Sequence, residues 1–214
     1  GPISSQTEQD TRRFADFCRI PVFDPSSPEE AYKMIGEAFE YSEKYNTPVL
    51  FRPTTRVCHA YASIDNCDSP SPKKYEGFVK DSKKWVIFPR LSFANHIMIE
   101  KRNVEIGKDF STYSANKAEG GNSEKVVVTS GISYAYTKEC LKDYPDVKLI
   151  KIATAYPFPE DFVLSSLEGA KEVLCIEELS PFIEEQILKL AGKHGLQLRV
   201  SGKLDRKVQA GGEN

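Results

Sequence analysis

The chain has 214 residues, of which 40% are hydrophobic and 28% charged, and its formal net charge is −2. This length and composition suit one large or two small folded domains and exclude an intrinsically disordered protein. The charge balance excludes the basic footprint of a nucleic-acid-binding protein, and no apolar run reaches the length of a membrane span or resembles a signal peptide.

The cysteines predict a reducing compartment. Their number is odd, and no two of them form a CxxC pair; they are Cys18, Cys58, Cys67, Cys140 and Cys175. Zinc and iron–sulfur sites require clustered thiolates, so we expect neither in this chain. Reduced thiols in a cytoplasmic protein are the expectation.

The chain opens with a predicted helix. Ser5 and Glu8 have the spacing of a capping box, which predicts a helix from residue 5 to about residue 18. We expect Phe14 and Phe17 to turn inward from this helix.

A strand–helix–strand pattern follows. Residues 21–24 predict a short extended segment, and Ser27 with the adjacent proline predicts the start of a second helix that ends before residue 46. Residues 49–51 predict a buried strand, and Arg52 to Arg56 lie where that strand ends.

The middle of the chain carries weaker patterns. Residues 85–88 predict a strand, residues 91–106 are compatible with a helix, and the Ser-, Asn- and Gly-rich residues 109–122 predict a linker. We therefore interpret residues 61–122 as an extended connector.

Regular alternation returns in the last third. Predicted strands at 126–128, 147–152, 172–176 and 196–200 alternate with amphipathic helices, one of which opens at Ser180 and is capped by Gly195. Apolar strands between such helices predict a mostly parallel sheet covered on both faces, which is an α/β fold.

Two polar stretches are candidate ligand sites. Residues 4–13 form a polar helix start that suits an anion, although a capped and solvated helix start is the favoured interpretation. Arg52 to Arg56 follow a strand, where open parallel sheets bind ligands, and two arginines with two hydroxyls suit a carboxylate. Salt bridges that fix the connector explain the same residues equally well.

Two further motifs favour structural roles. The turn from Thr129 to Ser133 resembles a phosphate loop but lacks its lysine and its glycine pattern, so a tight turn is favoured. Glu177 and Glu178 end a strand, and we interpret them as a solvated terminus because adjacent strand residues face opposite ways. Among the histidines, only His59 follows a candidate motif.

Five stretches in order resemble the alpha subunit of indolepyruvate:ferredoxin oxidoreductases, which belong to the 2-oxoacid:ferredoxin oxidoreductase superfamily. Thr7, Thr11 and Cys58 are mild departures from the family pattern. The stretches are SSQTEQDTR (4–12), RPTTRVCH (52–59), TSGISYAY (129–136), KIATAYPFP (151–159) and EELSPFIEEQ (177–186).

The resemblance implies an internal fragment with four parts. Residues 1–60 would be the end of a thiamine pyrimidine-binding-type domain, and residues 61–122 the connector. Residues 123–205 would be a transketolase C-terminal-like, three-layer α/β domain with a mostly parallel sheet, followed by a linker tail at 206–214. Diphosphate-binding and ferredoxin-like domains are expected elsewhere in the full-length subunit.

The resemblance also implies a chemistry and its components. The full-length subunit would decarboxylate an arylpyruvate oxidatively to an aryl-acetyl-CoA, using thiamine diphosphate, Mg²⁺ and 4Fe–4S clusters, none of which this fragment is expected to bind alone. The expected partners are the rest of the subunit, the beta subunit, ferredoxin, a 2-oxoacid and coenzyme A. We expect no catalytic residue and no metal ligand here, and the residues expected to border the cleft are Gln6, Glu8, Gln9, Asp10, Arg12, Arg52, Thr54, Thr55, Arg56 and His59.

Two other functions remain open from the residues. The chain would serve as a non-catalytic docking and assembly module if its polar turns hold no ligand. A stand-alone nucleotide-binding protein is disfavoured, because the glycine fingerprint is missing.

Overall fold

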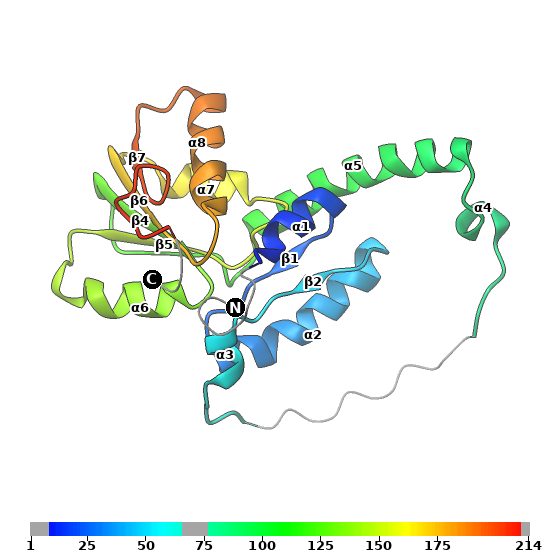
Figure 1. The fold of residues 1–214 in the computed structure, drawn as a ribbon, viewed down its shortest axis with the longest axis horizontal. Helices are drawn as coiled ribbons and strands as arrows, with labels where there is room; N and C mark the ends of the chain where they lie inside the picture. Colours follow the sequence, from blue (N-terminus) through cyan, green and yellow to red (C-terminus); the bar gives the residue numbers. More distant parts are fainter. Residues whose placement is uncertain (1–8, 66–76, 211–214) are drawn as a thin grey trace.

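The computed structural model describes residues 9–65 and 77–210 (Figure 1). Its helices are α1 (Thr11–Cys18), α2 (Pro28–Tyr45), α3 (Thr55–His59), α4 (Ser82–Trp85), α5 (Pro89–Ser111), α6 (Ser133–Cys140), the 3₁₀ turn η1 (Leu141–Asp143), α7 (Glu160–Ser166) and α8 (Phe182–His194). Its strands are β1 (Val22–Phe23), β2 (Leu50–Phe51), β3 (Lys117–Glu119), β4 (Lys125–Ser130), β5 (Lys148–Ile152), β6 (Glu172–Ile176) and β7 (Arg199–Ser201).

The C-terminal unit, residues 117–205, is built on a five-stranded sheet in the order β3-β5-β4-β6-β7. Strands β4 to β7 are parallel, and β3 runs antiparallel at the edge beside β5. Helix α6 covers one face, while α7 and α8 cover the other (Figure 1). The predicted α/β fold with a mostly parallel sheet is confirmed.

The N-terminal unit, residues 9–60, adds a two-stranded parallel sheet, β1-β2, alongside the larger one. The Val22 N–H donates to the carbonyl of Tyr156 over an N···O distance of 2.7 Å, and the Asp24 N–H donates to that of Ala153 over 2.8 Å. Strand β1 therefore lies between β2 and the segment that follows β5. Within the described ranges β2 pairs with β1 alone, so this small sheet is not closed.

Two hydrophobic clusters join the units. In the larger one, Ala15 of α1 and Val22 of β1 pack with the core side chains of β4, β5, β6, α7 and α8. The buried members of the smaller one come from β1, α2, α5 and the loop after β5, and they are Phe23, Met34, Ala38, Ile106, Phe110 and Ala153. Each cluster draws on both halves of the chain, so neither half completes a core alone.

The first helix differs from its prediction. Helix α1 begins at Thr11, and its cap is Asp10, whose side chain accepts from the backbone N–H two residues further on. The expected capping pair, Ser5 and Glu8, lies in residues 1–8, outside the described ranges. Phe14 and Phe17 are 56% and 86% exposed, so the prediction that they turn inward was wrong.

The second helix agrees with its prediction. Ser27 Oγ accepts from the Glu30 N–H at 3.2 Å, Pro28 is the first helical residue, and Asn46 ends the helix in the left-handed conformation. These signals are local, so the sequence is sufficient to place both ends.

The middle of the chain differs from its prediction in two places. Residues 82–85 form helix α4 and residues 86–88 lead into α5, so the strand expected at 85–88 was wrong. Pro89 takes the first position of a 23-residue helix, where its fixed φ is favourable. The linker expected at 109–122 instead contains the end of α5 and the edge strand β3.

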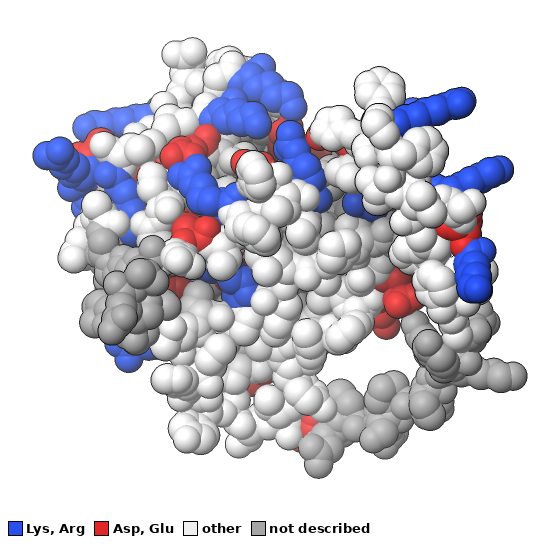
Figure 2. Space-filling model, turned by 45° about the vertical axis from the view of Figure 1, so that its right-hand side comes forward, with Lys and Arg blue, Asp and Glu red and all other residues white. Residues whose placement is uncertain are grey.

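The surface shows no continuous basic area on the face drawn in Figure 2. Lysine and arginine side chains lie among acidic ones over the upper part, and a wide lower area carries few charges. Among the described residues, no helix is both long and apolar enough to cross a bilayer.

The shared cores predict cooperative unfolding. Ile106 is fully buried in the smaller cluster, so Ile106→Ala should lower the free energy of unfolding by about 2–5 kcal/mol. The matched control on the same helix is Ile97→Ala, because Ile97 is 42% exposed and its loss should cost under about 1 kcal/mol. Urea denaturation followed by circular dichroism should show one transition that shifts as a whole. Two transitions, of which only one moves, would contradict the shared core.

Candidate functional site

The strand order creates a topological switch between β4 and β6. Helix α6 carries the chain from β4 to β5 on one side, and α7 then returns it to β6 on the other. At such a point the two loops at the carboxyl ends of the strands diverge, and open α/β sheets bind ligands in the crevice between them. Here those loops follow Ser130 and Ile176.

The crevice is occupied by Arg12 of the N-terminal unit. Its side chain is 1% exposed, and Nη1 donates to Glu177 Oε2 at 2.7 Å and to Ser130 Oγ at 3.3 Å. Nη2 donates to the main-chain carbonyls of Glu178 at 2.8 Å and Ser180 at 3.1 Å. One guanidinium thus bridges the loops after β4 and β6, which is the fork geometry that arginine supplies.

Asp10 completes the coordination from the N-terminal side. Its Oδ1 accepts from Arg12 Nε at 2.9 Å and its Oδ2 from Nη2 at 2.6 Å, a bidentate pair. Oδ2 also accepts from the Ser180 N–H at 3.2 Å. We call Asp10, Arg12, Ser130, Glu177, Glu178 and Ser180 the Arg12 cluster.

Glu177 is the partner carboxylate from the C-terminal unit. It is 1% exposed, and besides Arg12 its two oxygens accept from the backbone N–H groups of Ile183 at 2.8 Å and Glu184 at 2.9 Å. These are orphan donors in the first turn of α8, where a negative charge is favoured. Arg12 is therefore linked through Glu177 to the start of a core helix.

Burial and pairing shift the titration of this cluster. Burial raises the pKa of Glu177 above its ordinary value, and the charge of Arg12 only partly offsets this. Burial acts in the same direction on Asp10, but the hydrogen bonds and charge of Arg12 outweigh it, so the pKa of Asp10 is lowered. The Arg12 pKa is raised, because Glu177 and Asp10 outweigh the desolvation of its guanidinium.

A second ion pair lies beside the cluster. Arg52, at the end of β2, donates from Nη1 to Asp24 Oδ1 at 2.9 Å and from Nε to Thr11 Oγ1 at 3.2 Å. Asp24 is fully buried, and its burial raises its pKa despite the charge of Arg52. A Cβ at Gly131 would lie 3.2 Å from Asp24 Oδ1, and Gly131 has a φ of +54°. The tight turn predicted there needs glycine for both reasons.

The predicted cleft residues separate into three groups. Asp10, Arg12 and Arg52 come together in or beside the Arg12 cluster. Thr54 is the buried N-cap residue of α3, Thr55 opens that helix, and Gln9, Arg56 and His59 are exposed. Gln6 and Glu8 lie outside the described residues. The salt-bridge interpretation thus describes Arg52, although it gave no hint of Asp24 as the partner.

The sequence interpretation of Glu177 and Glu178 was wrong. Both are buried, at 1% and 4% exposure, although a solvated strand end was expected. For Glu177 the cause is Arg12, which approaches from a position 165 residues earlier and replaces water as the partner of its carboxylate. Arg12 contacts Glu178 through the main-chain carbonyl. The polar, charged face expected after the helix start is wrong for Arg12 for the same reason.

The five motifs converge in space. The first, third and fifth contribute Arg12, Ser130 and Glu177 to the Arg12 cluster. The second contributes Arg52, and the fourth contains Ala153 and Tyr156, whose carbonyls accept hydrogen bonds from Asp24, directly after β1, and from Val22 of β1. A pattern of ordered motifs was the sequence signal for this interface, although each motif alone indicated less.

This pair of α/β units, joined at a switch point, defines a fold class that solved structures share. A 2-oxoglutarate:ferredoxin oxidoreductase from Magnetococcus marinus, determined with 2-oxoglutarate, coenzyme A and succinyl-CoA bound, has a TM-score of 0.53. It is 15% identical in sequence, and the match covers 85% of this chain and 38% of that chain. At this identity the likeness concerns the fold.

Sequence comparison identifies the family. The chain is 37% identical over 208 residues to "Indolepyruvate oxidoreductase subunit IorA" of Thermococcus kodakarensis, covering 94% of this chain and 32% of that protein. The protein of the same name from Methanothermobacter thermautotrophicus is 36% identical over 207 residues, covering 95% and 33%. No family model matches the sequence.

The family resemblance predicted from the motifs is confirmed: over the stretch that it covers, the chain belongs to the indolepyruvate oxidoreductase subunit IorA family. The chain spans about a third of the length of these relatives.

The two aspartates predict opposite pH effects. The pKa of Asp10 is lowered, so the stability it contributes should be lost below its ordinary pKa of about 4. The pKa of Asp24 is raised, so its ionisation should cost stability as the pH rises above about 4. Urea denaturation at a series of pH values should show the advantage of wild type over Asp10→Asn shrinking at low pH. Stability relative to Asp24→Asn should instead fall as the pH rises, and slopes of the same sign would contradict these environments.

Proposed function

We propose that this chain is part of a thiamine diphosphate-dependent oxidoreductase that decarboxylates an arylpyruvate and transfers the acyl group to coenzyme A. The observation that carries this proposal is the 37% identity over 94% of the chain to a protein named indolepyruvate oxidoreductase subunit. In this proposal the chain fixes the position of its two α/β units relative to each other and provides one wall of the active-site cleft.

The cofactors are proposed to bind to parts of the full-length protein that correspond to regions of the relatives outside the stretch matched by this chain. Thiamine diphosphate, when bound, supplies the electron sink for decarboxylation. In the ranges that the structure describes, no three His, Cys, Asp or Glu side chains gather as a metal ligand set. The free cysteines of these ranges are scattered, so they do not suit a cluster; they are Cys18, Cys58, Cys140 and Cys175.

The cleft wall is proposed to lie at α3. This helix starts at the carboxyl end of β2, where parallel sheets place ligands, and it presents the exposed side chains of Arg56 and His59. Arg56 suits the carboxylate of a 2-oxoacid, and His59 suits a hydrogen bond to its keto oxygen. Arg52 and Thr54, both partly or wholly buried, position the start of the helix.

A docking and assembly module is the second candidate. The observation that favours it is the Arg12 cluster, in which every nitrogen of the guanidinium donates to an acceptor within this chain. In this case the rest of the subunit, the beta subunit and ferredoxin would contact a scaffold whose polar residues do not face substrate.

The test uses the chain assembled with the remaining length of the subunit. His59→Ala should lower kcat/KM for an arylpyruvate at least tenfold, a loss of about 1.4 kcal/mol in transition-state stabilisation, while gel filtration shows unchanged assembly. His194→Ala is the control, since His194 is also an exposed histidine, at the end of α8, and it should change kcat/KM less than twofold.

Unchanged turnover in His59→Ala would favour the docking module. The 214-residue chain alone should reduce no acceptor dye when thiamine diphosphate, Mg²⁺, coenzyme A and an arylpyruvate are supplied. Turnover by the chain alone would contradict the proposal that the cofactors bind to other parts of the full-length protein.

A further inference from the structure

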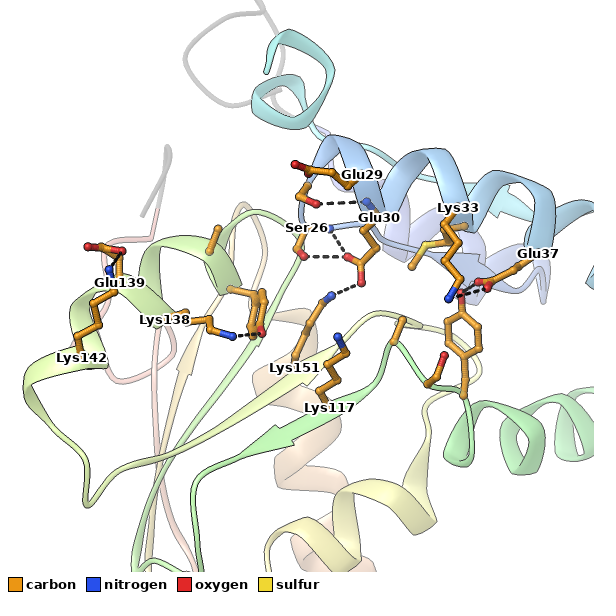
Figure 3. A pocket seen from close by; sticks show the side chains of 17 residues that line it. Ser26, Glu29, Glu30, Lys33, Glu37, Lys117, Lys138, Glu139, Lys142 and Lys151 are labelled. Atoms are coloured by element: carbon orange, nitrogen blue, oxygen red, sulfur yellow. Dashed lines mark hydrogen bonds and ion pairs between the residues drawn. The ribbon is translucent and has the colours of Figure 1, made fainter. Parts of the chain in front are cut away.

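A pocket of about 580 Å³ lies between the two units, on the side of the sheet that carries α6 (Figure 3). Its walls come from the start of α2, from α6, and from β3 and β5 with the segment before β3. Its volume lies in the range of small-molecule sites. The pocket contains none of the residues of the Arg12 cluster.

Two lysines on neighbouring strands face this pocket. Lys117 of β3 and Lys151 of β5 are direct cross-strand partners in the antiparallel pair, and Figure 3 shows both side chains directed into the same space. Like charges in such a position destabilise a sheet. Burial lowers the pKa of Lys151, and the charge of Lys117 adds to this effect, while Glu30 opposes it.

Only one of the two lysines has a carboxylate partner. Lys151 is 2% exposed, forms an ion pair with Glu30, and lies 4.8 Å from the centre of the Tyr134 ring. Lys117 is exposed and makes no ion pair or hydrogen bond among the described residues. The cross-strand pair therefore retains one positive charge that a bound anion would balance.

The other charges of the pocket largely cancel. Four of its five lysines pair with carboxylates of the chain, Lys33 with Glu37, Lys138 with Glu119, Lys142 with Glu139 and Lys151 with Glu30, and Lys117 is the fifth. Lys142 pairs with Glu139 at 2.6 Å, so its charge is compensated at the rim. A single negative charge fits this balance, whereas a doubly charged phosphate would meet the carboxylates of Glu29 and Glu30.

Besides Ser26, Ser27 and Ser114, the remaining lining residues are apolar or aromatic. Met34, Ala115 and Ala135 line the pocket beside the rings of Tyr113 and Tyr134. The hydroxyl of Tyr113 donates to Glu37 and that of Tyr134 to Glu119, so both rings are held in place by carboxylates. Fixed rings next to a cationic pair suit a flat apolar body that bears one acidic group.

We propose that this pocket binds a small aromatic monocarboxylate, with its carboxylate between Lys117 and Lys151 and its ring against Tyr134. Lys117 supplies a positive charge that has no ion-pair partner among the described residues. The contact to Lys151 is shared with Glu30, and the pocket therefore selects a monoanion over a dianion.

The test is isothermal titration calorimetry of the 214-residue chain with phenylacetate as the probe. Saturable binding is expected, and Lys117→Gln should weaken it at least tenfold. Lys142→Gln is the matched control, because Lys142 lines the same pocket but its charge is paired with Glu139, and it should weaken binding less than twofold. Because Lys117 is exposed, both variants should keep the wild-type unfolding midpoint or exceed it.

Two further probes separate the parts of the ligand. Benzyl alcohol carries the ring without the charge, and inorganic phosphate carries charge without the ring; both should bind at least tenfold more weakly than phenylacetate. Absent saturation with phenylacetate, equal losses in the two lysine variants, or tighter binding of either other probe would overturn the proposal. The titration needs neither thiamine diphosphate nor turnover, so its outcome is independent of the oxidoreductase proposal.

Discussion

The arrangement of the two units depends on one buried guanidinium. Arg12 enters the crevice between the carboxyl ends of β4 and β6, where it is 1% exposed and contacts carboxylates from both units. Removing a charge from water costs several kcal/mol, and only close, well-directed partners offset that cost. Asp10 and Glu177 provide those partners. The hydroxyl of Ser130 and the main-chain carbonyls of Glu178 and Ser180 accept further hydrogen bonds from the guanidinium.

Because Arg12 fills the crevice between β4 and β6, the sheet does not offer its usual ligand-binding position. In an open parallel sheet the switch point is the usual place for a ligand, but here it contains a side chain of the same polypeptide. The crevice therefore acts as an attachment point for the N-terminal unit, and the ligand sites proposed above lie elsewhere, at the α3 end of β2 and in the pocket on the α6 side. The proposed cleft wall and the proposed carboxylate pocket occupy these two places.

Local signals in the sequence were sufficient for much of the fold. Ser27 and Pro28 start a helix, Gly195 ends one in the left-handed conformation, and the apolar run at 172–176 is a strand at those residues. Each depends on side chains within a few residues of one another. The parallel sheet followed from the alternation of such elements.

The candidate site was harder to predict from the sequence, because the residues that form it are far apart in the chain. Arg12 and Glu177 are 165 residues apart in the chain. Each is a charged residue that, considered alone, would be predicted to lie on the solvent-exposed surface. Asp24 carries no motif at all, and its burial depends on Arg52 and on the space left by Gly131. Strand β3 was missed because three mostly exposed residues at a sheet edge have no apolar periodicity. The order of the five family motifs was the signal that linked these residues.

A double-mutant cycle between Arg12 and Glu177 tests the central interaction most directly. Arg12→Met should lower the free energy of unfolding by about 3–5 kcal/mol, because it leaves the buried carboxylates of Asp10 and Glu177 without their cation. Glu177→Gln should lower it by about 1.5–3 kcal/mol, because Arg12 keeps its bidentate pair with Asp10 and loses one charged hydrogen-bond acceptor. The double variant should cost less than the sum, with a coupling of about 2–3 kcal/mol, whereas the exposed Arg13–Glu185 pair should couple by under about 1 kcal/mol. Additive losses at Arg12 and Glu177 would contradict the account, since they would show that the two units are held together without this pair.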